Sequence, residues 1–438
     1  MRLKKLRSGL WSCKLKYLSI LPAVLLFFSS CASSKLVYPE NTIIPEDFAG
    51  IVHAGRSETE EEFVYLDHLG VKWILHTFNW SSIEPEQGEW DFLYYDDLVD
   101  RNKTAGMKII GLLAYDNWWI HDSSDAPRYI PSHRMPDFLN YARETVEHFR
   151  GRVDAWCIWN EPNSQFWRGT DEGFIELARL TADAVREVDS EVILLGGGFN
   201  RNILGLPEKF IRDLFESGAM EKTDGIAFHP YELNPYRTAL LYEKFKSIVD
   251  DYGFGDKIWI TEVGYPTGGW YPTRVQEKRF PEYVIKTWVL LAAGGAQKIL
   301  WYQLFDPISR SIGDSEDFFG LVRSREDYTS KGAEAFRLCS VFLSGTNCYA
   351  IEPGADSLPR AMRSFWFRGS GRGVLVIWND NLGQVRISLR LSGTDLVLHD
   401  PVTGAESQIQ ADTVVGVGRM PVFITWDGSG DRPEIRLF

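Results

Sequence analysis

Eight apolar runs, separated by longer amphipathic segments, constrain the fold of this chain most strongly. Each run is apolar throughout instead of alternating with polar residues, which is typical of parallel strands covered on both faces. The segments between them, such as 136–151 and 173–188, carry apolar residues at helical spacing. The runs are "FAGIVH" (48–53), "VKWILHTF" (71–78), "MKIIGLLAY" (107–115), "RVDAWCIWN" (152–160), "EVILLGG" (191–197), "GIAFHPY" (225–231), "KIWITEVG" (257–264) and "KILWYQLF" (298–305).

Eight strand–helix units in one continuous stretch predict an α/β fold, a (β/α)8 TIM barrel. A doubly wound sheet is the alternative layout, but no GxGxxG follows the first run. After residue 345 the chain changes to short β-type segments separated by Gly, Asp and Asn, as in a small β-sandwich. We therefore expect a barrel over 46–345 and a C-terminal β-sandwich over 346–438.

The N-terminus predicts an export signal. A basic stretch precedes the apolar run "YLSILPAVLLFF" (17–28), which is too short to span a bilayer. The following "SSCASS" resembles a bacterial lipoprotein cleavage site, at which Cys31 becomes the lipidated first residue. Ordinary secretion with cleavage nearby is the alternative. We expect a signal peptide over 1–30, a tether over 31–45, and an exported cell-envelope lipoprotein facing the periplasm or the outside.

Composition excludes several classes of partner. The formal net charge of −13 disfavours binding to nucleic acid or to anionic lipid, so the lipid anchor is the expected membrane contact. No CxxC motif or Cys/His cluster indicates zinc, and we expect no metal or cofactor. Cys339 and Cys348 could pair or remain as buried thiols. Aromatic content is 14%, enough to supply sugar-stacking surfaces, and five loop aromatics could stack or simply pack: Trp118, Trp119, Trp167, Trp270 and Tyr271.

Polar residues at the ends of apolar runs mark the candidate site, because active sites of TIM barrels lie where strands end. Asn160 and Glu161 close the fourth run, His229 and Tyr231 the sixth, and Glu262 the seventh. Strands four and seven face each other across an eight-stranded barrel. The two glutamates are therefore expected to meet across its mouth.

Two such carboxyls suit the cleavage of glycosidic bonds. Retaining enzymes hold them about 5–5.5 Å apart, so that one attacks the anomeric carbon while the other protonates the leaving oxygen. Two close carboxylates do not both ionise cheaply, so one keeps its proton to higher pH. Strand position alone does not say which glutamate has which role.

Several motifs carry a resemblance to a known superfamily. "WNEPN" (159–163) with "WITEVGYPT" (259–267) resembles the clan A glycoside hydrolases, as do "FNWSSIEPEQGEWDF" (78–92) and "FFGLVRSREDYTSKGAEAF" (318–336). The resemblance covers nearly all of 45–345 and is closest to glycoside hydrolase family 39 and its relatives.

The resemblance implies a role for each matching residue. Glu161 would be the acid/base and Glu262 the nucleophile. Asn160 would hydrogen-bond the sugar 2-hydroxyl. His229 and Tyr231 match "HPY" after strand six, and there the tyrosine hydroxyl would orient the nucleophile.

An aromatic floor for the sugar is implied at the end of strand eight. Trp301 or Tyr302 matches it, and strand alternation allows only one to face inward; we expect Trp301. Many clan A enzymes also place an arginine near the end of strand two, where this chain has Leu75 and His76. Either His76 substitutes as a pH-sensitive support, or Tyr231 alone holds the nucleophile.

The leading hypothesis is therefore a retaining glycoside hydrolase, monomeric, acting on an oligo- or polysaccharide of the cell envelope or the exterior. A glycan-binding lipoprotein without turnover is the alternative that the missing arginine favours. A transglycosylase using the same two glutamates is a further one.

Overall fold

The computed structural model describes most of the chain beyond the expected leader. The signal peptide and Cys31 lie outside the described residues, as do Trp270 and Tyr271. The described ranges are 36, 38–52, 59–121, 128–202, 205–269, 274–307, 310–311, 313–326, 328–351, 358–428 and 431–438.

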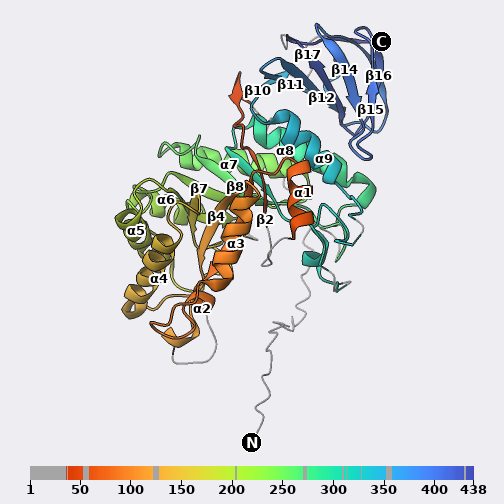
Figure 1. Cartoon of the computed structure of the whole chain (residues 1–438). Coiled ribbons are helices and arrows are strands. Elements are labelled where there is room, and N and C mark those ends of the chain that lie inside the picture. The colour runs from red at the N-terminus through yellow and green to blue at the C-terminus, as the bar shows by residue number, and fades with distance from the viewer. Residues whose placement is uncertain are drawn as a thin grey trace, which may run out of the picture. The chain divides into compact units, whose positions relative to one another are not determined.

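Eight parallel strands close into a barrel in chain order, each pairing with the next and the last with the first (Figure 1). This confirms the predicted TIM barrel. The strands are β2 (Ala49–Val52), β3 (Trp73–Asn79), β4 (Lys108–Ala114), β5 (Ala155–Ile158), β6 (Ile193–Asn200), β7 (Gly225–His229), β8 (Ile258–Val263) and β9 (Lys298–Trp301).

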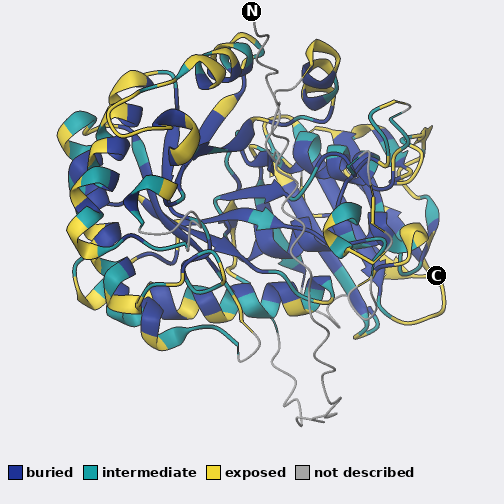
Figure 2. Ribbon diagram, turned by 90° about the horizontal axis from the view of Figure 1, so that it is seen from below, coloured by how far each residue is buried: buried dark blue, intermediate teal, exposed yellow. Residues whose placement is uncertain are grey.

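Helices surround the strands and turn their apolar sides inward, while their outer sides are exposed (Figure 2). Local signals set where they begin: Thr59 and Glu62 form a capping box at the first helix, and Thr170 caps the fifth. The helices are α1 (Glu60–His68), α2 (Trp80–Ile83), α3 (Leu93–Thr104), α4 (Met135–His148), α5 (Asp171–Val188), α6 (Glu208–Glu216), α7 (Pro235–Asp250), α8 (Phe280–Ala293) and α9 (Ala333–Leu343), with 3-10 turns η1 (Trp118–Ile120), η2 (Ser132–Arg134), η3 (Glu277–Arg279) and η4 (Ser315–Phe318).

Two antiparallel sheets follow the barrel, which confirms the predicted β-sandwich. One sheet has the order β1-β10-β11-β12-β17-β14-β15 and the other β16-β13-β18. The strand β1 comes from ahead of the barrel and pairs with β10. The bounds are β1 (Thr42–Ile43), β10 (Asn347–Ile351), β11 (Met362–Gly369), β12 (Arg372–Asn379), β13 (Val385–Arg390), β14 (Thr394–His399), β15 (Glu406–Gln408), β16 (Val414–Val417), β17 (Val422–Asp427) and β18 (Glu434–Leu437).

The central strands of the larger sheet, β11, β12 and β17, are buried on both faces. Phe365 and Phe367 of β11 belong to the same hydrophobic core as the barrel, whereas Trp366 between them belongs to the core of the sandwich. Because successive side chains of a strand point to opposite faces, one sheet serves both cores. Nearly every residue of α8 is buried as well, and the carbonyl of its last residue, Ala293, accepts a hydrogen bond from Thr42 at 3.0 Å.

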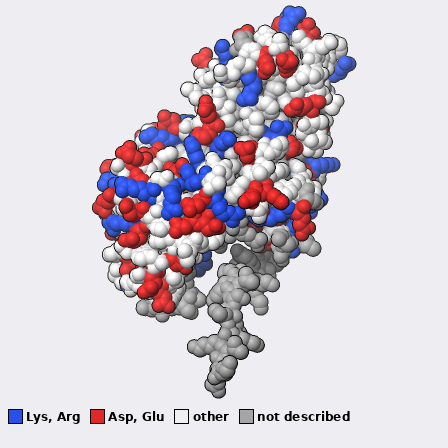
Figure 3. Space-filling model, viewed as in Figure 1, with Lys and Arg blue, Asp and Glu red and all other residues white. Residues whose placement is uncertain are grey.

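Acidic and basic side chains are interspersed on the face of the molecule shown in Figure 3. Among the described residues, no helix is both long and apolar enough to cross a membrane. The three described cysteines, Cys157, Cys339 and Cys348, are buried free thiols, so the last two are not paired.

Candidate active site

Glu161 follows β5 in a backbone conformation that residues other than glycine rarely adopt. Its φ is 44° and that of Trp159 is 64°, both in the left-handed region. Such residues cost about 1–3 kcal/mol each and persist only where their surroundings hold them. The Trp159 indole donates to the carbonyl of Phe166 at 3.0 Å, and the amide of Ser164 donates to the carbonyl of Glu161 at 3.0 Å. This turn explains how a glutamate leaves a buried strand and reaches the barrel mouth.

Glu262 lies in a bulge of β8. Ile260 pairs with Ile299 and Val263 pairs with Trp301, so β8 has two residues where β9 has one. A bulge changes the direction of the side chains next to it. It brings Glu262 to the mouth alongside Thr261, which is also directed toward the site.

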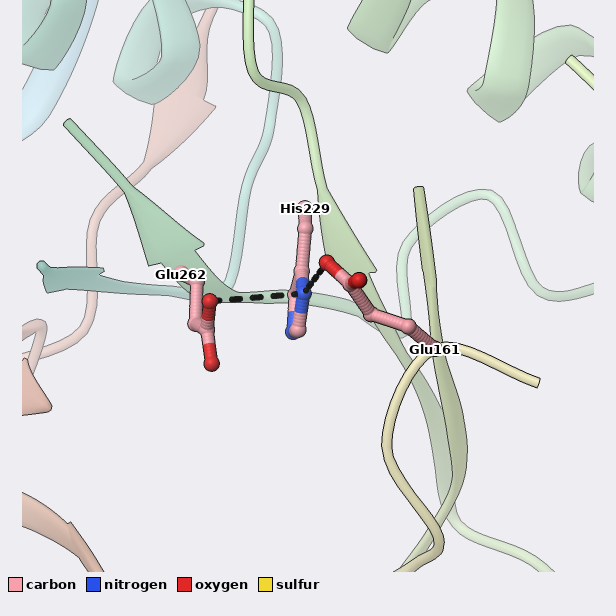
Figure 4. Close-up of side chains that lie close together, drawn as sticks. All are labelled: Glu161, His229 and Glu262. Carbon is pink, nitrogen blue, oxygen red and sulfur yellow. Dashed lines mark hydrogen bonds and ion pairs between the residues drawn. The ribbon is translucent and has the colours of Figure 1, made fainter. Parts of the chain in front are cut away.

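His229, at the end of β7, lies between the two glutamates (Figure 4). Its Nδ1 is 3.0 Å from Oε1 of Glu161 and 3.6 Å from Oε2 of Glu262, while its Nε2 is 3.0 Å from the hydroxyl of Thr261. An oxygen of each glutamate and a nitrogen of His229 all lie within 4.8 Å of one another. The nearest oxygens of the two carboxyls are thus no more than 4.8 Å apart.

Tyr231 supports Glu262 from the loop after β7. Its hydroxyl donates to Oε2 of Glu262 at 3.0 Å. Its ring packs edge-on against those of Tyr302 and Phe319, which fixes the direction of the hydroxyl. The contact expected from the "HPY" motif is present.

Burial and mutual charge shift the titration of this cluster. Burial, together with the charge of Glu161, raises the pKa of Glu262, although His229 and the Tyr231 hydroxyl oppose that rise. Burial alone would lower the pKa of His229, but the charges of both glutamates and the hydrogen bond to Glu161 outweigh it and raise that pKa. Glu262 and His229 therefore hold their protons to higher pH than the same side chains do in water.

Asn160 lies beside the acids at the mouth. It is half-buried, forms a bridge with Gly198 of β6, and is hydrogen-bonded to the hydroxyl of Tyr115. The side-chain amide is thereby held next to Glu161, where the resemblance requires a donor to the sugar.

The expectation that Trp301 faces inward is wrong. Trp301 is fully buried, and its ring lies 6.0 Å from those of Tyr265 and Phe280, the latter at the start of α8. Tyr302 faces the site instead, with its ring against Tyr231 and its titration affected by the charge of Glu262. The larger indole fills the space between strand and helix, which leaves the next residue for the mouth.

His76 is not brought to the acids. It is buried and hydrogen-bonded to Asn102 of α3, on the helix side of β3. Burial lowers the pKa of His76 to about 4, so the ring is neutral near pH 7. Among the described residues, Tyr231 and His229 are the groups that lower the pKa of Glu262, so His76 does not replace the missing arginine.

Comparisons with known proteins point to one superfamily. A family model described as beta-galactosidase (Glyco_hydro_42) matches residues 52–170. Endo-1,4-beta-xylanase B of Thermotoga neapolitana is 31% identical over 209 residues, 43% of this chain and 57% of that protein. Endo-1,4-beta-xylanase A of Phanerodontia chrysosporium is 24% identical over 168 residues, 36% of this chain and 40% of that protein.

Solved structures agree on the fold. A family 39 glycoside hydrolase from Bacteroides cellulosilyticus WH2 has a TM-score of 0.70 at 18% identity, covering 88% of this chain and 81% of that one. The family 30 xylanase Xyn30A from Clostridium acetobutylicum has a TM-score of 0.63 at 12% identity, covering 89% and 100%. The resemblance to clan A glycoside hydrolases is confirmed. Because this chain spans 57% of the length of the Thermotoga relative, the activity of the whole protein is a proposal.

Several residues of this site were not identified from the sequence. Tyr115 ends the third apolar run, so the strand-end rule that identified Glu161 could have found it. Ser164, which donates to Oε2 of Glu161 at 3.3 Å, and Thr261 carry no such signal.

Glu316 of η4 is a third carboxyl near the site, and it too was not predicted. Glu316 is hydrogen-bonded to Tyr302. Loss of hydrating water, together with the charges of Glu262 and Asp314, raises its pKa to about 7. The residue is exposed to solvent.

The cluster of Glu161, His229 and Glu262 also offers the ligand types of a divalent-cation site. Among the described residues it is the one group of three or more such side chains with suitably close donor atoms. In the present geometry these atoms are used in the hydrogen bonds of His229 and Tyr231.

The loop aromatics divide between packing and exposure. Trp167 is 5% exposed and packs edge-on against Trp159 and Phe174, so it belongs to the core. Trp118 is 49% exposed and its indole donates to the carbonyl of Pro85, which leaves much of its surface open to a sugar ring.

Proposed function

We propose that this protein is a retaining glycoside hydrolase, with Glu262 as nucleophile and Glu161 as acid/base. The observation that carries the proposal is the meeting of the two carboxyls at the barrel mouth, with oxygens within 4.8 Å on either side of His229. Strands four and seven of a clan A barrel supply them, as the sequence motifs imply. Since both sequence relatives described above are named endo-1,4-beta-xylanases, β-1,4-linked xylan is the first substrate to test.

The reaction would proceed by two displacements. An oxygen of Glu262 attacks the anomeric carbon while Glu161 gives its proton to the leaving oxygen, and a glycosyl ester forms. Esterification removes the charge of Glu262, so Glu161 then ionises readily and takes a proton from the water that cleaves the ester. Asn160 would bind the sugar 2-hydroxyl, a contact that strengthens in the transition state.

The roles of the two acids rest on their neighbours. Tyr231 donates to Glu262 alone, and a hydrogen bond to a carboxylate favours its ionised, attacking form. Glu161 follows Asn160 and accepts from Ser164, with His229 between it and Glu262. His229 is a positioning residue, because it contacts both acids and fixes their separation.

Glu161→Gln and Glu262→Gln should each lower kcat on an aryl xyloside by at least about 10³-fold, since each removes a group that acts in the transition state. Melting temperatures should stay close to that of the parent. Glu147→Gln, at an exposed position of α4, is the matched control and should keep full activity. Substantial activity in either site variant would refute the mechanism.

The nucleophile is identified by rescue. Glu262→Gly with added azide should yield a glycosyl azide of inverted anomeric configuration, whereas Glu161→Gly should yield one of retained configuration. The reverse pattern would exchange the two roles. Because two carboxyls complete this mechanism, treatment with EDTA should leave the rate unchanged.

We also propose export with a lipid on Cys31, from the motif in the leader. Incorporation of labelled palmitate and sensitivity of processing to globomycin would support it. An unlabelled, normally secreted protein would contradict it.

A further inference from the structure

A polar pocket of about 430 Å³ lies where the barrel helices meet the C-terminal sandwich. Its walls come from the first turns of α7 and α8, from β11, and from the loops that precede β13 and β17. The volume is within the range of small-molecule sites. Pro235 is its one lining residue without a polar side-chain atom, so the pocket does not suit an apolar ligand.

The pocket has more positive than negative charge. Four cations line it, Arg279, Lys286, Arg363 and Arg419, against two carboxylates. The whole chain is acidic, with a net charge of −13, so this local excess of positive charge is contrary to the protein's overall balance.

Two of the cations already satisfy the two acids. Glu282 accepts from Nε and Nη2 of Arg279, both at 3.1 Å, and from Lys286 at 3.0 Å. Asp380 accepts from the hydroxyl of Tyr236 at 2.7 and 2.6 Å and lies 3.4 Å from Lys286. An ion-pair network that only joined the two parts would be complete with these contacts.

Arg363 and Arg419 are two further cations that this ion-pair network does not need. Nε of Arg419 is 3.8 Å from Glu282, is buried, and has no hydrogen-bond partner among the described residues. Nε of Arg363 is 3.9 Å from Asp380, and its Nη1 is held in place by the carbonyls of Arg360 and Met362 at 2.7 and 3.0 Å. Each of the two guanidinium groups is at ion-pair distance from an acid but beyond hydrogen-bond distance of it, so neither acid accepts a direct hydrogen bond from them.

The ligand chemistry follows from the guanidinium group. Its planar fork of N–H donors matches a carboxylate in two parallel hydrogen bonds. The pocket also lies at the end of the barrel that carries the catalytic acids, because helices of a TIM barrel begin where strands end. Asn234 in its wall is three residues from Tyr231, so at most about 11 Å of chain separates them. A short oligosaccharide could reach both places.

We propose that this pocket binds the carboxylate of an acidic sugar unit of the glycan, with Arg363 and Arg419 as its principal donors. The identity of the ligand as a sugar rests on the proposed hydrolase function. The pocket would then select glycans that carry uronic acid units near the cleaved bond.

The test is binding to the full chain by calorimetry, with D-glucuronate, D-glucose and inorganic phosphate as probes. Glucuronate should bind at least 10-fold more tightly than either glucose or phosphate. The Arg363→Gln/Arg419→Gln variant should lose at least 10-fold in glucuronate affinity. Arg368→Gln, an exposed arginine on the same strand as Arg363, is the matched control and should bind as the parent does.

Three outcomes would overturn the proposal: no glucuronate binding, phosphate binding as tight as that of glucuronate, or glucuronate binding unaffected by the double variant. Melting temperatures establish that each variant is folded. Should the double variant not fold, Arg419→Gln alone carries the test, with a loss of at least 3-fold expected. Binding requires no turnover, so a failure here is distinguishable from a failure of the hydrolase proposal.

Discussion

At the scale of single residues, Tyr231 favours the ionised form of Glu262, the proposed nucleophile. Its hydroxyl lowers the pKa of Glu262 against the raising effects of burial and of Glu161. Tyr231→Phe removes that hydrogen bond, so the pKa of Glu262 rises further and the ionised form requires a higher pH. A hydrogen bond to a charged group is worth about 1.5–3 kcal/mol, or roughly one to two pH units.

The acid limb of kcat/KM against pH should therefore move upward by about one unit in Tyr231→Phe. The basic limb, which reports the acid, should move less. Tyr349→Phe, on β10 of the sandwich, serves as the control and should leave the profile unchanged. A fall in rate with no shift of the acid limb would mean that the hydroxyl acts on the substrate rather than on Glu262.

Much of the site could be predicted residue by residue because parallel strands deliver their last side chains to one end of the barrel. That rule placed Glu161, His229, Tyr231 and Glu262 together. It did not distinguish Trp301 from Tyr302, because β9 ends at Trp301 and the alternation of a strand does not apply to Tyr302 beyond its end.

His76 shows a different reason for a missed assignment. A strand buried on both faces is apolar on both, so the sequence does not show which side of β3 faces the barrel interior. The partner that decides the direction is Asn102, twenty-six positions later on α3.

At the scale of elements, one ammonium group ties together the loops after β8 and β9. Nζ of Lys331 is 2.8 Å from both oxygens of Asp306, and it contacts Thr267 at 3.0 Å and the carbonyl of Phe318 at 3.3 Å. Phe318 ends η4, the turn that carries Glu316 to the site. The ion pair is almost fully buried, with 1% exposure on each side chain.

Lys331→Met should cost about 3 kcal/mol of unfolding free energy, because it removes the cation that contacts both oxygens of the buried Asp306 and leaves Arg310, 3.7 Å away, as the remaining counter-charge. Lys331→Met with Asp306→Leu should recover most of that loss, since two apolar groups replace the pair. Urea denaturation measures both. A single variant that loses less than about 1 kcal/mol would show that water or a neighbour satisfies Asp306.

At the opposite end of the barrel, Asp47 forms ion pairs with the first residues of two strands. Nζ of Lys298 lies 2.6 Å from Oδ1 of Asp47, and Nζ of Lys108 lies 2.7 Å from Oδ2. Burial alone would raise the pKa of Asp47, but these two lysines outweigh it and lower the pKa to about 2. The folded pKa is below the unfolded value, so the stabilisation is complete above about pH 4 and is lost as pH falls toward 2.

Asp47→Asn should therefore reduce the unfolding free energy at pH 7 by about 2 kcal/mol. The difference from the parent should shrink below about pH 4, where the native carboxyl begins to take up a proton. Chemical denaturation at pH 7, 4 and 3 checks this dependence. An equal difference at all three values would mean that charge is not the cause.

At the scale of the whole molecule, the sequence predicted a barrel and a sandwich but not the way they are joined. Each of the eight predicted runs overlaps a barrel strand, and six contain theirs completely, whereas β3 and β6 extend beyond the end of theirs. The segments 136–151 and 173–188 contain most of α4 and α5. The two-residue strand β1 is too short to leave a periodic signal, yet it adds residues from ahead of the barrel to the sandwich sheet. Because the central strands of that sheet are buried on both faces, apolar and polar residues do not alternate along them, and the sequence does not show which face is inner and which is outer.

That shared sheet leads to a prediction about cooperativity. Phe367 of β11 is fully buried in the core that includes the barrel, whereas Leu375 of β12 is fully buried in the core of the sandwich. If one sheet couples both cores, calorimetry should show a single unfolding transition in which the barrel and the sandwich unfold together. Phe367→Ala should lower its unfolding free energy by about 3–5 kcal/mol and Leu375→Ala by about 2–5 kcal/mol, without splitting the transition.

These two substitutions show whether the barrel core and the sandwich core unfold together or separately. In an independent arrangement, Leu375→Ala would shift a sandwich transition and leave a barrel transition in place, so two peaks would separate. In a coupled one, a cavity on either face of the sheet weakens both cores, because the same strands carry both sets of side chains. Activity measured during heating should then be lost at the temperature of the single calorimetric transition, and loss at a lower temperature would contradict the shared core.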